Sequence, residues 1–147
     1  MNNNFSALFA KCQLSEPAPE QTIKKVEEEI GEKLPITYMA FLRFSNGLEG
    51  AIGEDGYIQL WKVEDLVKRN KDYQVEEFAP GFFLIGSSGG GEALGIDLRE
   101  RSSTWGHFYS VPFEVLSWKE AKYLGQTIDD IVANFNAPTK LGNRKRS

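Results

Sequence analysis

The chain has 147 residues and a formal net charge of -4 at pH 7, with 41% hydrophobic and 26% charged residues. This length and balance predict one folded domain with a full hydrophobic core, and they exclude a disordered chain. The negative charge argues against nucleic acid as a partner and favours a basic macromolecule, because like charges slow association with a phosphate backbone.

Cysteine content and the N-terminal sequence indicate the compartment. The single cysteine, Cys12, can form no disulfide within the chain, and no cysteine and histidine cluster suggests a zinc site. Residues 1–6 lack the basic and apolar regions of a signal peptide, and no window approaches the roughly 18 apolar residues of a membrane-spanning helix. We therefore expect a cytoplasmic protein without membrane association, metal or cofactor.

Two helices are predicted in the N-terminal part of the chain. From Glu20 to Pro35, apolar residues recur at spacings of three and four, which predicts a helix with one buried face. These apolar residues are Ile23, Val26, Ile30 and Leu34. Pro35 suits the first turn of a second helix, and Asn46-Gly47 is a left-handed cap signal that would end it. Two helices separated by one proline must change direction, so we expect them to pack as a corner on a common sheet.

Strands with one short helix are predicted in the middle of the chain. Asp55-Gly56 is a tight-turn signal between two apolar segments, which predicts a hairpin. The run Phe82–Ile85 is short enough to be a buried strand, with a partner after the glycines that follow it. The predicted elements are a hairpin (48–53 and 57–61), a helix (63–70) and two paired strands (82–85 and 93–98).

The C-terminal part predicts two more strands and a helix. The strands, 106–111 and 114–118, are separated by Pro112, which cannot donate to a ladder. Thr127 then caps a helix over 128–135 whose acidic first turn favours the helix dipole. Because the helices and strands do not alternate regularly, we expect an α+β fold with a mainly antiparallel sheet, N-terminal helices and a C-terminal helix packed on it. The expected organisation is an N-terminal segment (1–19), a single domain (20–136) and a basic C-terminal tail (137–147).

The glycine-rich segment Ile85–Leu98 is the most distinctive motif. Gly86-Ser87-Ser88-Gly89-Gly90 matches the G-x-S-x-G nucleophile elbow, and Asp97 and His107 follow in the order of an α/β-hydrolase triad. An elbow needs a helix after the serine, however, and residues 92–98 alternate like a strand. We favour a hairpin turn that requires positive φ, and we keep a serine hydrolase that uses Ser88 as an alternative. Glu92 follows the glycines where a phosphate-binding loop has Lys-Ser/Thr, so no nucleotide is predicted.

Two motifs together resemble the SUKH superfamily. The first is Leu34-Pro35-Ile36-Thr37-Tyr38-Met39-Ala40-Phe41-Leu42, ending in Asn46-Gly47, which is similar to that family's L-P-x-x-Y-x-x-F-L helix. The second is Ile85-Gly86 with its glycine cluster, which is similar to I-G-x-x-G-G-G-[DE] and leads into a strand with an acidic residue. The matching positions are Leu34, Pro35, Tyr38, Phe41, Leu42, Asn46, Gly47, Gly86, Gly90, Gly91, Glu92 and Asp97. The resemblance spans roughly residues 20–135 and implies an α+β fold without known catalysis.

The resemblance implies a non-catalytic protein-binding domain. The superfamily includes bacterial immunity proteins that neutralise polymorphic toxins and fungal regulators of cell-wall assembly and glucan synthesis. We expect an immunity protein bound to a toxin domain, with a regulator or scaffold as the alternative. A basic nuclease toxin would suit the acidic chain. Candidate contacts, chosen because loops and tryptophans often carry binding, are Glu49, Glu54, Asp55, Glu92, Glu100 and Trp105.

Overall fold

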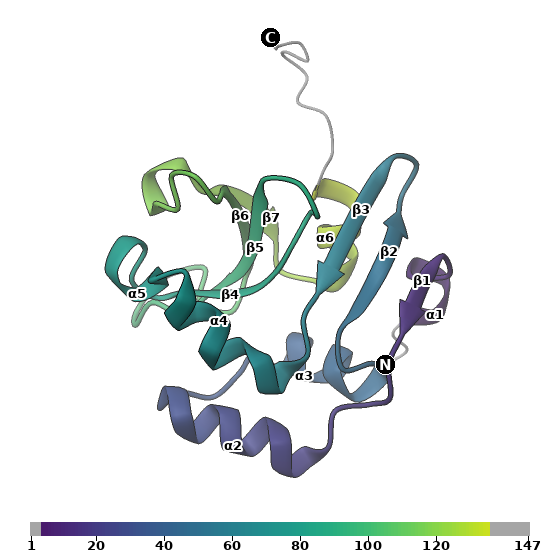
Figure 1. The fold of residues 1–147 in the computed structure, drawn as a ribbon, viewed down its shortest axis with the longest axis horizontal. Helices are drawn as coiled ribbons and strands as arrows, with labels where there is room; N and C mark the ends of the chain where they lie inside the picture. The colour runs from purple at the N-terminus through teal and green to yellow at the C-terminus, as the bar shows by residue number, and fades with distance from the viewer. Residues whose placement is uncertain (1–3, 136–147) are drawn as a thin grey trace, which may run out of the picture.

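A seven-stranded antiparallel sheet forms the framework of the computed structural model, which describes residues 4–135 (Figure 1). Each strand pairs with the next one along the chain, so the strand order in space is the strand order in sequence. The strands are β1 (Cys12–Leu14), β2 (Leu48–Ile52), β3 (Gly56–Leu60), β4 (Phe82–Ser87), β5 (Glu92–Asp97), β6 (Phe108–Pro112) and β7 (Lys122–Gly125). The predicted α+β class and antiparallel sheet are confirmed.

The helices are short and surround the sheet. In Figure 1, α2 and α3 lie beneath the β2–β3 hairpin, whereas α4 and α5 lie beside β4. The α-helices are α1 (Phe5–Leu8), α2 (Glu20–Ile30), α3 (Ile36–Phe44), α4 (Leu66–Asp72), α5 (Val75–Phe78) and α6 (Ile128–Asn134), and the 3-10 helices are η1 (Val63–Asp65) and η2 (Trp118–Glu120). None of the helices in residues 4–135 has the length and apolarity needed to span a bilayer.

Strand β4 separates two apolar clusters, which explains the apolar run Phe82–Ile85 at its start. Phe83 and Ile85 belong to the main core, whereas Phe82 and Leu84 belong to a second cluster on the opposite face. Successive side chains of a strand point to opposite faces, so a segment that is buried on both sides favours apolar residues at consecutive positions. The main core contains four of the family-motif positions, which are Leu34, Tyr38, Phe41 and Leu42.

Helix α2 is shorter than the sequence predicted. It ends at Ile30 because Gly31 adopts a left-handed conformation with φ 72°, and the Gly31 N–H donates to the Glu27 carbonyl oxygen at 2.9 Å. Leu34 is buried in the connection beyond the helix, where its N–H donates to the Glu27 carboxylate at 2.8 Å. Pro35 lies just before α3 rather than inside its first turn. The periodic pattern therefore continued beyond the helix because Leu34 enters the core from the linker.

Asn46 and Gly47 do not cap α3 as predicted. Helix α3 ends at Phe44, and the Asn46 side chain instead accepts the Val63 N–H and donates to Glu64, both at 2.8 Å. Gly47 has φ 85°, and a Cβ there would lie 2.5 Å from the Leu60 carbonyl oxygen. The glycine is required for a close approach to β3, and the asparagine joins the start of β2 to η1.

The predicted strand at 114–118 is wrong. Leu116 has a positive φ of 36°, and its N–H donates to the Pro112 carbonyl oxygen at 2.9 Å, so the chain turns there. The turn buries Leu116 in the second cluster. Strand β7, which the sequence did not predict, pairs with β6 farther along the chain. Helix α5 was also not predicted.

The residues before Glu20, set apart from the domain in the sequence analysis, contribute to the sheet and the core. Strand β1 pairs with β2 as an edge strand. The rings of Phe5 and Phe9 lie 6.0 and 5.8 Å from the ring of Phe41 in edge-on arrangements. The basic tail 137–147 lies outside the described residues.

The glycine-rich segment forms the predicted hairpin turn between β4 and β5. Gly89 has φ 80°, and the Ser88 hydroxyl accepts the N–H groups of Gly90 and Glu92 at 3.1 and 3.2 Å. Gly86 lies at a register shift in β4, where a Cβ would collide with the Gln59 carbonyl oxygen of β3. A Cβ on Gly91 would meet no atom within 4 Å. The motif glycines therefore have different structural roles.

This difference predicts unequal costs for alanine at two motif positions. Gly86→Ala should lower the free energy of unfolding by about 1–3 kcal/mol, because β3 or β4 must shift to admit the methyl group. Gly91→Ala should change it by no more than about 0.5 kcal/mol. Urea unfolding followed by tryptophan fluorescence measures both, and equal effects of the two substitutions would contradict this interpretation.

Candidate functional site

A groove of about 910 Å³ lies between α2, the α4–α5 segment and the loop that follows β5. Its floor is apolar and includes two half-buried residues, Ile30 and Val67, with Phe83 and Leu98 beneath them. The last two remain 7% and 8% exposed, so the floor is accessible from the groove. An apolar hollow of this size can bury several side chains of a partner.

Carboxylates line the rim of the groove on both sides. Glu29 and Glu32 belong to α2 and the turn after it, and the opposite side carries carboxylates from α5 and the loop after β5, namely Glu76, Glu77 and Glu100. The basic side chains lining the groove are Lys71 and Arg99. The rim is therefore predominantly acidic.

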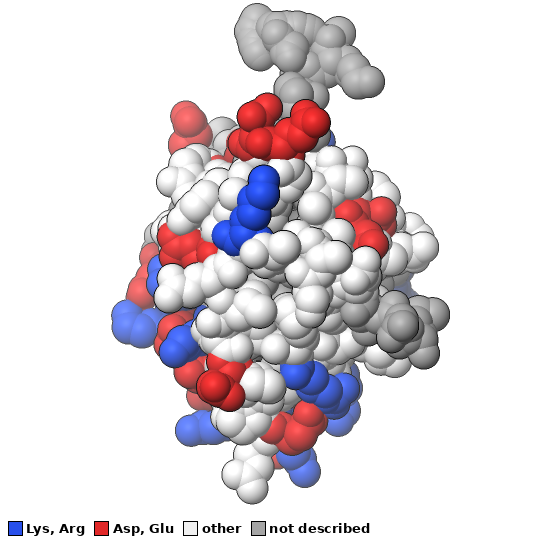
Figure 2. Space-filling model, turned by 90° about the vertical axis from the view of Figure 1, so that its right-hand side faces the viewer, with Lys and Arg blue, Asp and Glu red and all other residues white. Residues whose placement is uncertain are grey.

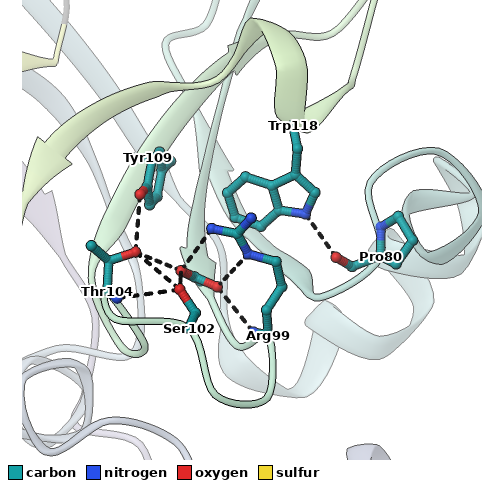
Figure 3. A network of polar contacts seen from close by, with 7 residues as sticks. Pro80, Arg99, Ser102, Thr104, Tyr109 and Trp118 are labelled. Carbon is teal, nitrogen blue, oxygen red and sulfur yellow. Dashed lines mark hydrogen bonds and ion pairs between the residues drawn. The ribbon is translucent and has the colours of Figure 1, made fainter.

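Arg99 is held by a buried carboxylate at the end of β5 (Figure 3). Asp97 is 0% exposed, and its Oδ1 accepts the Arg99 backbone N–H at 2.9 Å and Nε–H at 3.0 Å. Its Oδ2 accepts from the Arg99 Nη2, the Ser102 hydroxyl and the Thr104 hydroxyl at 3.0, 2.6 and 2.7 Å. Burying a charge is costly unless donors replace water, and these donors do so. The network also fixes the loop 98–106 against the end of β5.

A face of the planar Arg99 guanidinium, whose edge binds Asp97, packs on an aromatic ring. Its central carbon lies 3.6 Å from the ring centroid of Trp118, whose Nε1–H donates to the Pro80 carbonyl oxygen at 2.7 Å (Figure 3). Tyr109 meets the Trp118 ring edge-on, with centroids 5.1 Å apart, and its hydroxyl lies 3.0 Å from that of Thr104. The charge of Arg99 is thus balanced by Asp97, and one wall of the groove is rigid.

Comparison with known proteins identifies the family. A model of the SMI1 / KNR4 family (SUKH-1) matches residues 17–134. The chain belongs to this family. It is also similar to "Uncharacterized protein YnaB" of Bacillus subtilis (strain 168), with 31% identity over 77 residues that cover 52% of this chain and 49% of that protein. The chain thus matches about half the length of this relative. Membership of the SMI1 / KNR4 family supports a role as an immunity or regulatory protein.

The candidate contact residues lie on several elements of the SMI1 / KNR4 fold. Glu100 lines the groove, whereas Glu49 lines a smaller hollow of about 330 Å³ and accepts hydrogen bonds from Tyr57 and Gln59. The remaining positions are the exposed hairpin turn (Glu54 and Asp55), the half-buried start of β5 (Glu92) and the loop after β5 (Trp105, 36% exposed). Burial raises the pKa of Glu92. Of these residues, only Glu100 lines the acidic groove.

The face with β1 and the β2–β3 hairpin differs from the groove in its charge pattern. Figure 2 shows that its centre is uncharged and that acidic side chains gather at its upper end, where the hairpin turn lies in Figure 1. Tyr57 and Leu14 are exposed on these strands, at 39% and 45%. The hairpin turn presents its carboxylates to solvent without an apolar floor, so it is a weaker candidate for partner binding.

Several residues of the site were not predicted from the sequence. The sequence did contain a signal for the Asp97 network. Asp97 lies near the end of a predicted strand and is followed by Ser102 and Thr104, residue types whose side chains often hydrogen-bond to nearby groups in turns. The contact between Arg99 and Trp118 could not be predicted from local spacing, because the two residues are far apart in the sequence. The rim carboxylates on α5 were missed because α5 itself was not predicted.

The residues of the hydrolase alternative bond to different partners. The Ser88 hydroxyl accepts N–H groups of its own turn, Asp97 holds Arg99, and His107 Nδ1 lies 2.8 Å from the Tyr123 hydroxyl. Ser88 is followed by strand β5 rather than by the helix that a nucleophile elbow requires. These contacts give each residue a structural role and do not support the elbow interpretation.

The buried Asp97 carboxylate predicts that a single substitution of similar size will lower the stability of the fold strongly. Asp97→Asn should lower the free energy of unfolding by about 2–4 kcal/mol, because it removes charge-assisted hydrogen bonds and leaves Arg99 without its counter-ion. Asp55→Asn, in the exposed hairpin turn, should change it by less than about 0.5 kcal/mol. Chemical unfolding at neutral pH compares the two variants, and a cost below about 1 kcal/mol for Asp97→Asn would contradict the prediction.

The same carboxylate should make stability depend on pH. Burial would raise the pKa of Asp97, but hydrogen bonds from Arg99, Ser102 and Thr104 outweigh burial and hold that pKa well below its usual range. A group with a lower pKa when folded contributes stability that is complete above its unfolded pKa and is lost as pH falls toward the folded value. The stability difference between the wild type and Asp97→Asn should therefore shrink below about pH 4. Unfolding measured from pH 7 to pH 3 tests this, and a constant difference would contradict it.

Proposed function

We propose that the chain is a cytoplasmic immunity protein that binds a toxin domain and neutralises it by covering its active surface. The observation that carries the proposal is membership of the SMI1 / KNR4 family over residues 17–134. The side chains that could suggest catalysis support this direction, because Ser88 and Asp97 hold backbone turns and the Asp97 network orders a loop. Neutralisation then requires complementary surface rather than chemistry.

A basic nuclease domain suits this chain as the toxin. The net charge of -4 would attract a basic partner, and opposite potentials speed encounter and fix the orientation of docking. An immunity protein gains from fast association, because the toxin must be bound before it acts. The regulator alternative within the same family would bind a synthesis or signalling enzyme that does no harm to the cell, so the nature of the partner separates the two functions.

Identification of the partner tests the proposal. The tagged full chain is expressed in its source cell and cross-linked, and the recovered partner is expressed in a second host with and without the chain. We expect the partner alone to stop growth and co-expression to restore it. A partner that leaves growth unchanged and whose enzymatic rate responds to the chain contradicts the toxin proposal and supports regulation. Recovery of the chain alone contradicts both.

A further inference from the structure

We infer that the acidic groove between α2, α5 and the loop after β5 docks a partner segment that combines basic and apolar side chains. The groove is the space lined by Glu29, Glu32, Glu76, Glu77 and Glu100 above an apolar floor. The toxin identity of the partner rests on the proposed function, whereas binding of such a segment does not. The two can therefore fail separately.

The shape of the groove favours a polypeptide segment. Its volume of about 910 Å³ exceeds that of the hollow beside β2, about 330 Å³, and it is partly open to solvent rather than enclosed. The half-buried Ile30 and Val67 and the edges of Phe83 and Leu98 supply the apolar contact. Phe78, at the end of the neighbouring α5, is a further exposed apolar side chain, at 52%, outside the groove lining. Apolar contact of this kind favours Leu-like or aromatic side chains at the centre of an interface.

The negative charge of the rim favours basic side chains in the bound partner segment. Carboxylates stand on both sides of the floor, so a bound chain would meet negative potential along both edges. Arg99 does not offset this potential, because its guanidinium is paired with the buried Asp97 carboxylate and stacked on Trp118. Lys71 is the other basic side chain among the lining residues. Lysine and arginine side chains therefore complement the rim, and acidic ones are repelled.

The walls of the groove are held before any partner arrives. The Asn70 side chain accepts the Leu84 N–H at 2.9 Å and donates to the Leu84 and Leu66 carbonyl oxygens at 3.0 and 2.8 Å, which fixes α4 on β4. Beside the loop after β5, the Leu98 N–H donates to the Gly81 carbonyl oxygen at 2.7 Å. Pre-organised walls lower the entropy lost on binding.

Binding of synthetic peptides tests the groove independently of any toxin. The probes are a short peptide of mixed Lys and Leu residues and its counterpart with Glu in place of every Lys, each titrated into the isotope-labelled full chain and followed by NMR. We expect the Lys peptide to shift the amides of residues 74–77, 81–83 and 98–100. Stronger shifts elsewhere, or equal binding of the Glu peptide, would overturn the inference.

Two matched double variants separate the groove from the overall charge. Glu76→Gln with Glu77→Gln removes two carboxylates from the rim, and Glu54→Gln with Asp55→Asn removes two from the hairpin turn. We expect the first pair to weaken binding of the Lys peptide about tenfold and the second to change it less than about twofold. All four positions are exposed, so unfolding curves should match those of the wild type. Equal weakening by both pairs would show non-specific attraction and overturn the inference.

A toxin assay distinguishes failure of the inference from failure of the proposed function. If the wild type neutralises the recovered toxin, the Glu76→Gln, Glu77→Gln variant should require more protein for the same protection, and unchanged protection overturns the inference alone. If the wild type neutralises no toxin but the Lys peptide binds in the groove, the groove stands as a docking site and the toxin proposal fails.

Discussion

The buried carboxylate of Asp97 is the constraint on which much of this structure depends. A charged group removed from water at the end of β5 is tolerated only when donors surround it, and the following loop provides them from Arg99, Ser102 and Thr104. Satisfying the carboxylate therefore determines the path of residues 98–106. The same path places Arg99 on Trp118 and Glu100 on the rim of the groove. The network that satisfies the carboxylate thus also shapes one wall of the groove.

Close approach of backbones is the second constraint, and it explains the family motifs. Gly47 and Gly86 both lie where a side chain would collide with a carbonyl oxygen of β3, so the motifs mark the places where β2 and β4 approach β3. Asn46 reinforces the first approach by holding η1. The motifs therefore specify the architecture, whereas the acidic rim arises from residues outside them.

The sequence predicted the fold class and the hairpins well because turn chemistry and strand alternation are local signals. Asp55-Gly56 and the glycines around Gly89 predicted the two hairpin turns directly. Predictions from the sequence were wrong where a distant contact decides the local structure. The chain turns at Leu116 because that side chain packs in the second cluster. Leu34 fits the helical spacing of α2, but it enters the main core from the linker after the helix. The groove was not predicted, because its floor and rim come from elements that are far apart in the sequence, although one candidate contact, Glu100, lines it.

Native-state hydrogen exchange on the wild type and Asp97→Asn tests the central claim, that one buried carboxylate orders the loop forming a wall of the groove. The backbone N–H of Arg99 donates to the Asp97 carboxylate, and the backbone N–H of Gly106 donates to the Asp97 carbonyl oxygen at 2.7 Å. In the variant, we expect the amides of residues 99–106 to lose more protection from exchange than the drop in global stability explains. The amides of β2 and β3 should lose no more than that drop. Uniform loss across the fold, or unchanged protection in the loop, would contradict the account.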